Sequence, residues 1–277
     1  MSPFNKRRAF GQHFLKDRTI TQQIAETVLT EAKRGDCQAL LEIGPGKGAI
    51  TEPILAMLKS EPAVPKLILC EKDRILAQRW KDEALSSHFK LQIEEADFLE
   101  LTSQHWLQST PLAVVSNLPY SAGTRILTTL AKYPHKITVM VLMFQAEVAH
   151  RLRATSGTKD WGSLSIWIQN RWDVKKLVSV PPRSFSPPPQ VNSEVVILTP
   201  RALARIPNTE SAENEALFEN LVKTCFAHRR KMLRSSLPSS GIWREALAQS
   251  GIDGTRRAEM LGWEDWEKFF AAALRLR

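Results

Sequence analysis

The stretch Ala39-Leu40-Leu41-Glu42-Ile43-Gly44-Pro45-Gly46-Lys47-Gly48 joins an apolar run to a glycine-rich turn. Its first five residues have the length and composition of a buried strand, and a helical stretch follows from Ala49 to about Lys59. Strand, glycine turn and helix in this order begin many doubly wound α/β sheets. Glycines let the backbone approach a ligand, and a helix N-terminus favours an anionic group. The stretch predicts an α/β fold with a cofactor site at the end of this strand.

The spacing of the glycines limits which nucleotide cofactor fits. The turn lacks the Gly-Lys-Ser/Thr ending of a P-loop, whereas Gly44-x-Gly46-x-x-Ala49 loosely matches a dinucleotide fingerprint. Glu42, two residues before the first glycine, favours S-adenosylmethionine, because an acidic group there can order the loop and offset the sulfonium charge. A NAD-dependent enzyme is an alternative that a cofactor-binding assay would exclude.

Acidic residues also follow the next two predicted strands. The strand at residues 66–70 ends in Glu71, 27 residues beyond the first glycine, close to where an acidic residue meets the ribose hydroxyls in such folds. The strand at residues 90–93 leads to Asp97, which can accept a hydrogen bond from the cofactor adenine, with Phe98 beside the ring. For Glu71 the alternative is a helix N-cap or a surface acid.

A fourth polar loop, Asn117-Leu118-Pro119-Tyr120, lies between a predicted strand and a predicted helix, where open α/β sheets bind ligands. Pro119 fixes its own φ and pushes the preceding residue to extended geometry. The Asn117 amide, the Leu118 carbonyl and the Tyr120 ring therefore form one rigid group. Two acceptors beside an aromatic ring are suited to bind a flipped adenine. The acceptors can bind its amino group, and the ring can stack on its face, a contact worth about 1–3 kcal/mol. The alternative is an ordinary turn with a packed tyrosine.

The remaining chain extends the sheet and adds a helical region. Strands are predicted at residues 112–115, 136–143, 164–170, 174–180 and 195–198, and helices at 19–32, 124–130 and 144–152. The proline-rich stretch 181–189 is a rigid loop that presents Phe185, either as a core anchor or as a base-stacking ring. We place a catalytic domain at residues 1–200 and a helical domain at 201–277, with 207–209 as a linker.

Composition indicates an acidic polymer as partner. The 277 residues are 43% hydrophobic, a normal globular value, and carry a net charge of +9. The basic residues are clustered, which favours phosphate contacts with a nucleic acid over the alternative of a merely soluble basic protein. The clusters are Lys6-Arg7-Arg8, His150-Arg151 with Arg153, Arg171 with Lys175-Lys176, His228 to Lys231 with Arg234, and Arg256-Arg257.

Other classes of protein lack support in the sequence. No apolar run approaches the roughly 20 residues of a transmembrane helix, and no apolar segment of a signal peptide follows the basic N-terminus. The three cysteines form no Cys-x-x-Cys pair, and the six histidines form no His-Glu-x-x-His motif. We therefore expect a cytoplasmic protein with neither metal nor membrane contact.

Taken together, the ordered motifs resemble the small-subunit group of the ribosomal RNA adenine dimethylase family, through nearly the whole chain. The motifs are Phe10 to Leu15, Leu41 to Gly46, Asn117 to Tyr120, Gln145 to Val148, Trp161 to Ser165, Phe185 to Val191 with Ser193, Phe226 to Lys231, and Arg257 to Glu259.

The resemblance implies a Rossmann-like class I methyltransferase with a small all-α C-terminal domain. It implies S-adenosyl-L-methionine as cofactor and four methyl transfers to two adjacent adenosines near the 3′ end of small-subunit rRNA, in the assembling small ribosomal subunit. We expect a monomer. The implied cofactor contacts are His13, Leu15, Gly44, Glu71, Asp97 and Asn117, and the implied catalytic residues are Asn117, Leu118, Pro119, Tyr120 and Phe185.

The sequence departs from the family pattern at a few positions. His13 stands where the family usually has Asn, Ser121 to Gly123 and Arg125 differ after the tyrosine, and Gln190 replaces a usual Lys. The alternatives are a non-catalytic RNA-binding assembly factor, a large-subunit rRNA methylase of the macrolide-resistance type, and a DNA adenine methylase. The intact acidic residues and Asn117 to Tyr120 favour an enzyme, and the helical C-terminal region favours the small subunit.

Overall fold

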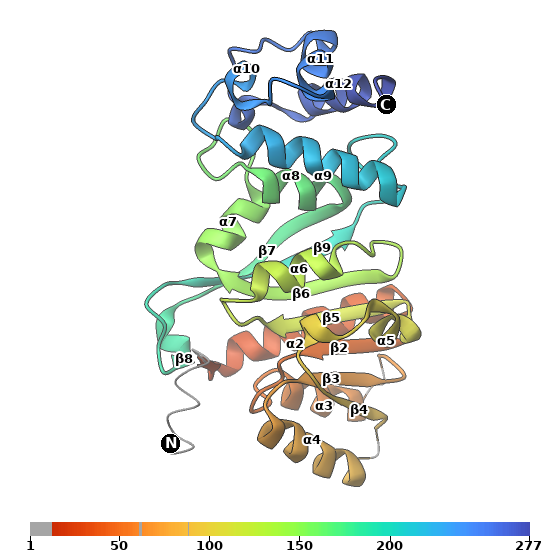
Figure 1. Ribbon diagram of the computed structural model, residues 1–277. Coiled ribbons are helices and arrows are strands. Elements are labelled where there is room, and N and C mark those ends of the chain that lie inside the picture. Colours follow the sequence, from red (N-terminus) through yellow and green to blue (C-terminus); the bar gives the residue numbers. More distant parts are fainter. Residues whose placement is uncertain (1–12, 61–62, 88) are drawn as a thin grey trace. The chain divides into compact units, whose positions relative to one another are not determined.

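A computed structural model describes residues 13–60, 63–87 and 89–277 (Figure 1). Its contacts divide the chain into two compact units. The sheet unit contains the described residues up to Ala149 together with Val174–Pro200. The helical unit contains His150–Asp173 and Arg201–Arg277.

The sheet unit is built on seven strands in the order β4-β3-β2-β5-β6-β9-β7. β2, β3, β4, β5 and β6 are parallel, and β9 is antiparallel to β6, which confirms the predicted α/β class with an antiparallel end. The strand order reverses between β2 and β5, and ligands of such sheets bind at that point. The strands are β2 (Ala39–Ile43), β3 (Leu67–Glu71), β4 (Leu91–Glu95), β5 (Leu112–Asn117), β6 (Ile137–Gln145), β7 (Trp172–Val180) and β9 (Ser193–Pro200).

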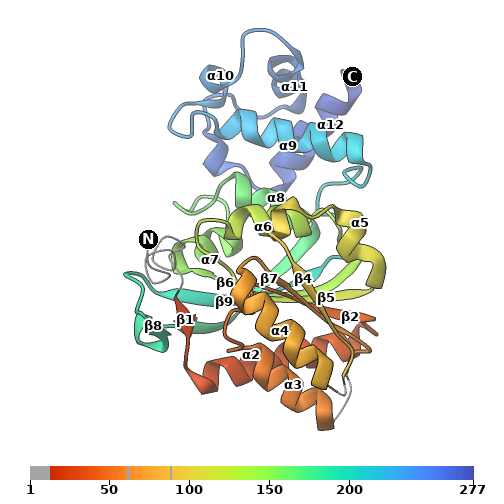
Figure 2. The same ribbon diagram turned by 60° about the horizontal axis from the view of Figure 1, so that its bottom comes forward.

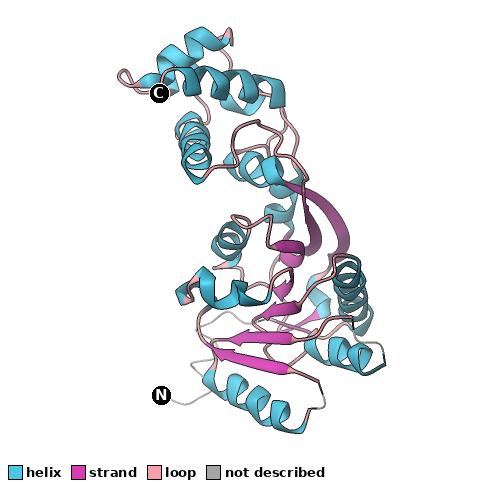
Figure 3. Ribbon diagram, turned by 90° about the vertical axis from the view of Figure 1, so that its right-hand side faces the viewer, coloured by secondary structure: helices cyan, strands magenta, loops and turns pink. Residues whose placement is uncertain are grey.

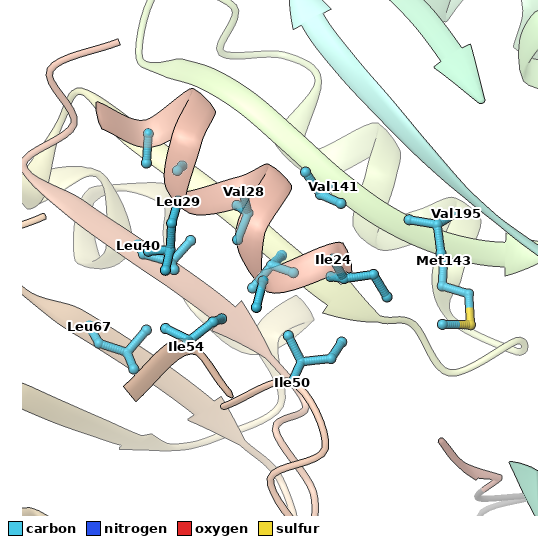
Figure 4. Packing of buried hydrophobic residues seen from close by; sticks show 14 of the residues in the cluster. Ile24, Val28, Leu29, Leu40, Ile50, Ile54, Leu67, Val141, Met143 and Val195 are labelled. Atoms are coloured by element: carbon cyan, nitrogen blue, oxygen red, sulfur yellow. The ribbon is translucent and has the colours of Figure 1, made fainter. Parts of the chain in front are cut away.

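Helices cover both faces of this sheet (Figure 3). The longest, α2, begins after Asp17, whose carboxylate accepts a hydrogen bond from the Ile20 amide. Its apolar face, including Ile24 and Val28, packs on the sheet beside Val141 (Figure 4). The helices and helical turns of this region are α2 (Arg18–Arg34), α3 (Thr51–Ser60), α4 (Arg74–Ser86), η1 (Phe98–Glu100), α5 (Ser103–Trp106), η2 (Leu107–Ser109), α6 (Gly123–Leu130), α7 (Ala146–Arg153) and η3 (Pro182–Ser184).

A short two-stranded sheet joins the first described residues to the proline-rich loop (Figure 2). β1 (Phe14–Leu15) pairs antiparallel with β8 (Phe185–Ser186), with Leu15 opposite Phe185. Both of these side chains are buried in the main hydrophobic cluster. The sequence did not predict this pairing, because two-residue strands have no periodicity to detect.

The helical unit has its own hydrophobic core. Trp266, Phe269 and Phe270 are fully buried, and Trp243 and Trp263 are partly buried against the same core. The elements are α8 (Ser163–Arg171), α9 (Ala212–Phe226), α10 (Leu233–Ser236), α11 (Ile242–Ser250), η4 (Ala258–Met260) and α12 (Trp263–Arg275).

The predicted strand at residues 164–170 was wrong, because this segment forms helix α8. Its alternating sequence imitates a half-buried strand, but the helix is buried on most sides, so no polar face reveals its period. The buried polar side chains find partners elsewhere in the helical unit. Asn170 donates to Thr209 Oγ1 at 3.0 Å and accepts from the Ile206 amide at 2.8 Å.

These contacts also show that the expected linker is packed, and the compact units divide the chain at other positions than the expected boundary. Thr209 is completely buried, and its carbonyl accepts from Arg171 at 3.0 Å, so the turn at 206–209 is a packed part of the helical unit. The compact units place residues 150–173 with the helices, whereas a boundary at residue 200 places them with the sheet. The functional domains 1–200 and 201–277 therefore stay a prediction.

Among the described residues, none of the helices combines the length and the apolar character needed to span a membrane. Cys37, Cys70 and Cys225 are all buried free thiols.

Candidate active site

The predicted acidic and polar residues meet at one edge of the sheet. Glu71 is the last residue of β3 and lies opposite Glu95, two residues before Asp97. Asn117 is the last residue of β5 and lies opposite Met143, two residues before the end of β6. The parallel strands thus carry all of these residues to their carboxyl ends, on both sides of the point where the strand order reverses.

The glycine turn after β2 depends on conformations that other residues adopt only with strain. Gly44 has φ +67° and Gly48 has φ +93°. A Cβ at Gly44 would meet no atom within 4 Å, whereas a Cβ at Gly48 would lie 2.8 Å from the Trp80 ring. Trp80 also donates from Nε1 to the Gly46 carbonyl at 3.0 Å. One glycine therefore faces open space that a cofactor can enter, and the other packs against the core.

Glu71 holds the turn from the neighbouring strand. Its Oε2 accepts from the Gly46 amide at 2.9 Å, and its Oε1 accepts from the Asp73 amide at 2.8 Å. Burial raises the pKa of Glu71 above its ordinary value, and the two amide hydrogen bonds oppose that effect. Each carboxylate oxygen keeps a second lone pair, so Glu71 can still accept from ribose hydroxyls. The N-cap alternative does not apply, because Asp73 caps α4.

Glu42 lies beneath the same turn. It is 2% exposed, and the Thr51 hydroxyl donates to its Oε2 at 2.7 Å. Burial raises the pKa of Glu42 to about 8, the Thr51 bond opposes the rise, and the charge of Glu71 adds to it. Glu42 therefore orders the turn through Thr51, and near neutral pH it is largely protonated when no cation is nearby.

Asp97 begins the turn after β4. Its Oδ1 accepts from the Leu99 amide at 3.0 Å, and Lys72 Nζ lies 2.7 Å from its Oδ2. The hydrogen bond from Lys72 holds the pKa of Asp97 below its ordinary value. Phe98, expected beside the cofactor ring, is instead 3% exposed and packs against Trp106, with ring centroids 5.4 Å apart. Lys72, not Phe98, is the neighbour of the expected adenine acceptor.

The side-chain amide of Asn117 is oriented by the first described residue. Asn117 Nδ2 donates to the His13 carbonyl at 3.4 Å, a long bond, and its Oδ1 accepts from none of the described residues. His13 is itself held in place, because its Nδ1 lies 2.8 Å from the Pro187 carbonyl. The preceding hydroxyl, Ser116, donates to the Ile43 carbonyl at 2.5 Å and ties β5 to the end of β2.

The loop from Leu118 to Tyr120 has the predicted rigidity. The Pro119 carbonyl accepts from the Ala122 and Gly123 amides, at 3.0 and 2.8 Å, at the start of α6. The Leu118 carbonyl has no hydrogen-bond partner among the described residues. Tyr120 is half-buried, and its hydroxyl lies 2.7 Å from the Ser193 hydroxyl. Free acceptors and an anchored ring therefore lie together on this loop.

Two predicted site residues have their side chains in the core. Phe185 is 1% exposed and Leu15 is 4% exposed, and both belong to the main hydrophobic cluster. Their burial favours the core-anchor alternative for Phe185, which supports the proline-rich loop from below. Any contact of Leu15 with a cofactor must therefore use its backbone.

The described residues contain no group of three or more His, Cys, Asp or Glu side chains arranged to hold a metal ion. The basic cluster Lys6-Arg7-Arg8 and the motif residues before His13 lie outside the described residues.

The family model described as "Ribosomal RNA adenine dimethylase" matches residues 3–273. The chain belongs to the ribosomal RNA adenine dimethylase family. It is therefore an enzyme of this family, with S-adenosylmethionine as its methyl donor. The glycine turn, Glu71 and Asp97 fit that cofactor, because a cradle with open space at Gly44 lies beside two carboxylates.

Relatives named ribosomal RNA small subunit methyltransferase A cover nearly the full dimethylase chain. The sequence from Syntrophotalea carbinolica is 36% identical over 95% of this chain and 94% of its own length. The sequence from Laribacter hongkongensis is 38% identical over 94% of this chain and 93% of its own length.

Solved structures share the fold of the dimethylase chain. A dimethyladenosine transferase from Plasmodium falciparum superposes with a TM-score of 0.72 at 22% identity, covering 93% of this chain and 96% of that chain. The 23S rRNA methyltransferase ErmE superposes with a TM-score of 0.62, also at 22% identity, covering 94% and 98%. These likenesses confirm the Rossmann-like methyltransferase fold.

Sequence reasoning missed three residues that shape this site. Lys72 pairs with Asp97, Trp80 supports the glycine turn, and Ser193 anchors Tyr120. Of these three residues, only Ser193 belonged to a recognised motif of the sequence, and that motif did not indicate Tyr120 as its hydrogen-bond partner. The other two act across 25 and 34 residues of sequence, so no local pattern could have found them.

Proposed function

We propose that this enzyme dimethylates N6 of two adjacent adenosines near the 3′ end of small-subunit rRNA. One observation carries the proposal: Asn117 Oδ1 and the Leu118 carbonyl, which lie beside the anchored ring of Tyr120, are acceptors with no partner among the described residues. An adenine N6 amine has two N–H donors attached to a flat ring, which is the complement of that group. The names of the relatives support the small subunit as substrate.

The site's own residues can make N6 a better nucleophile. The lone pair of N6 is delocalised into the adenine ring, so the free amine attacks poorly. Two acceptors, Asn117 Oδ1 and the Leu118 carbonyl, would bind its hydrogens, favour a pyramidal nitrogen and stabilise the positive charge that develops. Preorganised polar groups of this kind are commonly the largest contribution to catalysis.

Positioning provides the second contribution. Tyr120 stacks on the flipped base, and its hydroxyl bond to Ser193 fixes the ring. Holding two reacting atoms on a fixed line of approach can remove much of the entropic cost of bringing them together. The cofactor supplies an electrophilic methyl group when bound. No strong general base is needed, because the methylated N6 is acidic enough to lose its proton to solvent.

The first experiment combines the purified protein, S-adenosylmethionine and small ribosomal subunits from cells that lack the modification. Mass spectrometry after RNA digestion would count monomethyl- and dimethyladenosine and locate them. We expect dimethyladenosine at two adjacent positions near the 3′ end. The Asn117→Ala variant should lose about 100-fold or more in rate, the usual effect of removing one preorganised polar group.

Two controls make this result decisive. S-adenosylhomocysteine binding by calorimetry should stay within several-fold of wild type in Asn117→Ala, which separates chemistry from folding. Near-normal turnover in that variant would overturn the assigned role of Asn117. Tight subunit binding by the wild type without methyl transfer would favour a non-catalytic assembly factor, and methylation of large-subunit rRNA instead would overturn the substrate.

A further inference from the structure

A groove lies beside the proposed base site, at the junction of β6, α7 and the proline-rich loop. Its volume is about 410 Å³, whereas the hollow beneath Leu118 to Tyr120 measures about 10 Å³. The groove is therefore the larger of these two hollows. It is lined by Gln145, Ala146, Glu147, Pro182, Gln190, Val191 and Asn192.

The backbone of the groove is fixed, but its polar side chains have no partners in the part of the chain that the structure describes. The Ala146 amide donates to the Asn192 carbonyl at 2.9 Å, and Gln145 lies opposite Ser193 in the pairing of β6 with β9. In contrast, the side chains of Gln145, Glu147, Gln190 and Asn192 make no hydrogen bond or ion pair with any described residue. Glu147, Gln190 and Asn192 are exposed and Gln145 is partly exposed, so these side chains are available to an external ligand on a fixed backbone.

The chemistry of the lining favours a nucleobase over a phosphate. Three side-chain amides can both donate and accept, and Glu147 accepts only, which matches the mixed edge of a base. Apolar surface from Pro182 and from Val191, which is 44% exposed, offers contact for the flat face of a base. A carboxylate at the rim repels an anionic group, so Glu147 disfavours a phosphate at this place.

The groove also lies next to the groups that would hold the target adenine. Gln145 borders both the groove and the hollow beneath Leu118 to Tyr120. Asn192 directly precedes Ser193, whose hydroxyl anchors Tyr120 at 2.7 Å. A nucleotide in the groove would therefore be a close neighbour of the nucleotide at Tyr120.

We propose that this groove binds the adenine of the second adenosine while the first is held at Tyr120. The inference rests on the proposed function, because that function makes the neighbouring nucleotide an adenosine. The adenine amine would donate to Glu147, and the side-chain amide of Asn192 would donate to a ring nitrogen. The groove would thereby select strands with an amine-bearing base next to the target.

The test is a double-mutant cycle between the groove and the RNA. Glu147→Ala and Asn192→Ala would be compared with wild type on small subunits carrying the natural adenosine, or uridine, next to a single remaining target. With the natural neighbour, we expect each variant to lose roughly tenfold in kcat/KM, as for one good base contact. With uridine as the neighbour, the kcat/KM of the wild type should fall by about the same factor. On that RNA, the substitutions should lower kcat/KM little further.

The controls separate this proposal from the proposed function and from folding. Glu26→Ala, an exposed acidic residue on α2, should behave as wild type, and both groove variants should bind S-adenosylhomocysteine normally. If the variants lose kcat/KM equally on both RNAs, or on neither, the proposed role of the groove is wrong. The proposed function would remain intact. If the wild type does not methylate adjacent adenosines, both proposals fall together.

Discussion

The cofactor half and the base half of the sheet edge differ in how their polar groups are satisfied. In the cofactor half, Glu42, Glu71 and Asp97 each accept at least one hydrogen bond from the protein itself. In the base half, the Leu118 carbonyl and the Glu147 carboxylate have no partner among the described residues. The cofactor half thus satisfies its polar groups internally, whereas the base half holds its acceptors in place but depends on its ligand to supply donors. Specificity for RNA should therefore depend on the base half.

The largest expected effect comes from a substitution that disturbs the glycine turn of the cofactor half. Gly48→Ala places a Cβ 2.8 Å from Trp80 at φ +93°, so strain and overpacking should lower the free energy of unfolding by roughly 2–4 kcal/mol. Gly157→Ala, with φ +82° and no atom within 4 Å, carries only the strain of the backbone. Urea denaturation of both variants would measure the difference. Equal losses would show that the contact with Trp80 is not tight.

The next effect concerns affinity for the cofactor. Glu71→Gln replaces one accepting oxygen with an NH₂ group that faces a backbone amide, which leaves a buried donor unsatisfied. Such a defect costs about 1–3 kcal/mol, so S-adenosylhomocysteine should bind roughly 10- to 100-fold more weakly by calorimetry. RNA binding without cofactor should be unchanged. A parallel loss of RNA affinity would contradict the independence of the two halves.

Another effect depends on pH. The folded pKa of Glu42 is about 8 against an ordinary value of 4.5, so the folded state binds more protons between these values. The contribution of Glu42 to stability is therefore complete below about pH 4.5 and is lost as the pH rises through 8. Glu42→Gln does not titrate, and its stability relative to wild type should increase by at most about 1.4 kcal/mol per pH unit. Urea denaturation at pH 5 and pH 8 would test this, and a constant difference would contradict it.

The smallest expected effect is a gain. Lys72 Nζ lies 2.7 Å from Asp97 Oδ2, where it would compete with the adenine amine that we expect Asp97 to bind. Lys72→Leu should strengthen S-adenosylhomocysteine binding roughly two- to fivefold at low salt and less at high salt, as for an exposed ion pair. Lys81→Leu, which removes an ion pair with Glu95, should have no effect. Weaker binding by Lys72→Leu would show instead that the lysine supports the cofactor.

The sheet and the acidic rim were predictable because local patterns encode them. The strand at residues 39–43 has the predicted bounds, and Glu71, Asp97 and Asn117 lie at or just after strand ends as expected. Periodicity failed at α8, because burial on most sides removes the polar face that identifies a helix. It also could not show that Phe98 and Phe185 point into the core, since burial of a single ring depends on distant segments.

The helical unit consists of two separate stretches of chain, residues 150–173 and 201–277. A protein truncated after Pro200 would keep α8 but lose Thr209, so the buried Asn170 and Arg171 would lose partners that satisfy them. An exchange of this unit between relatives would therefore need junctions at 149/150, 173/174 and 200/201. Recombination at the last junction alone would bring α9 from one parent and α8 from the other, so the partners of Asn170 and Arg171 would have to match across the graft.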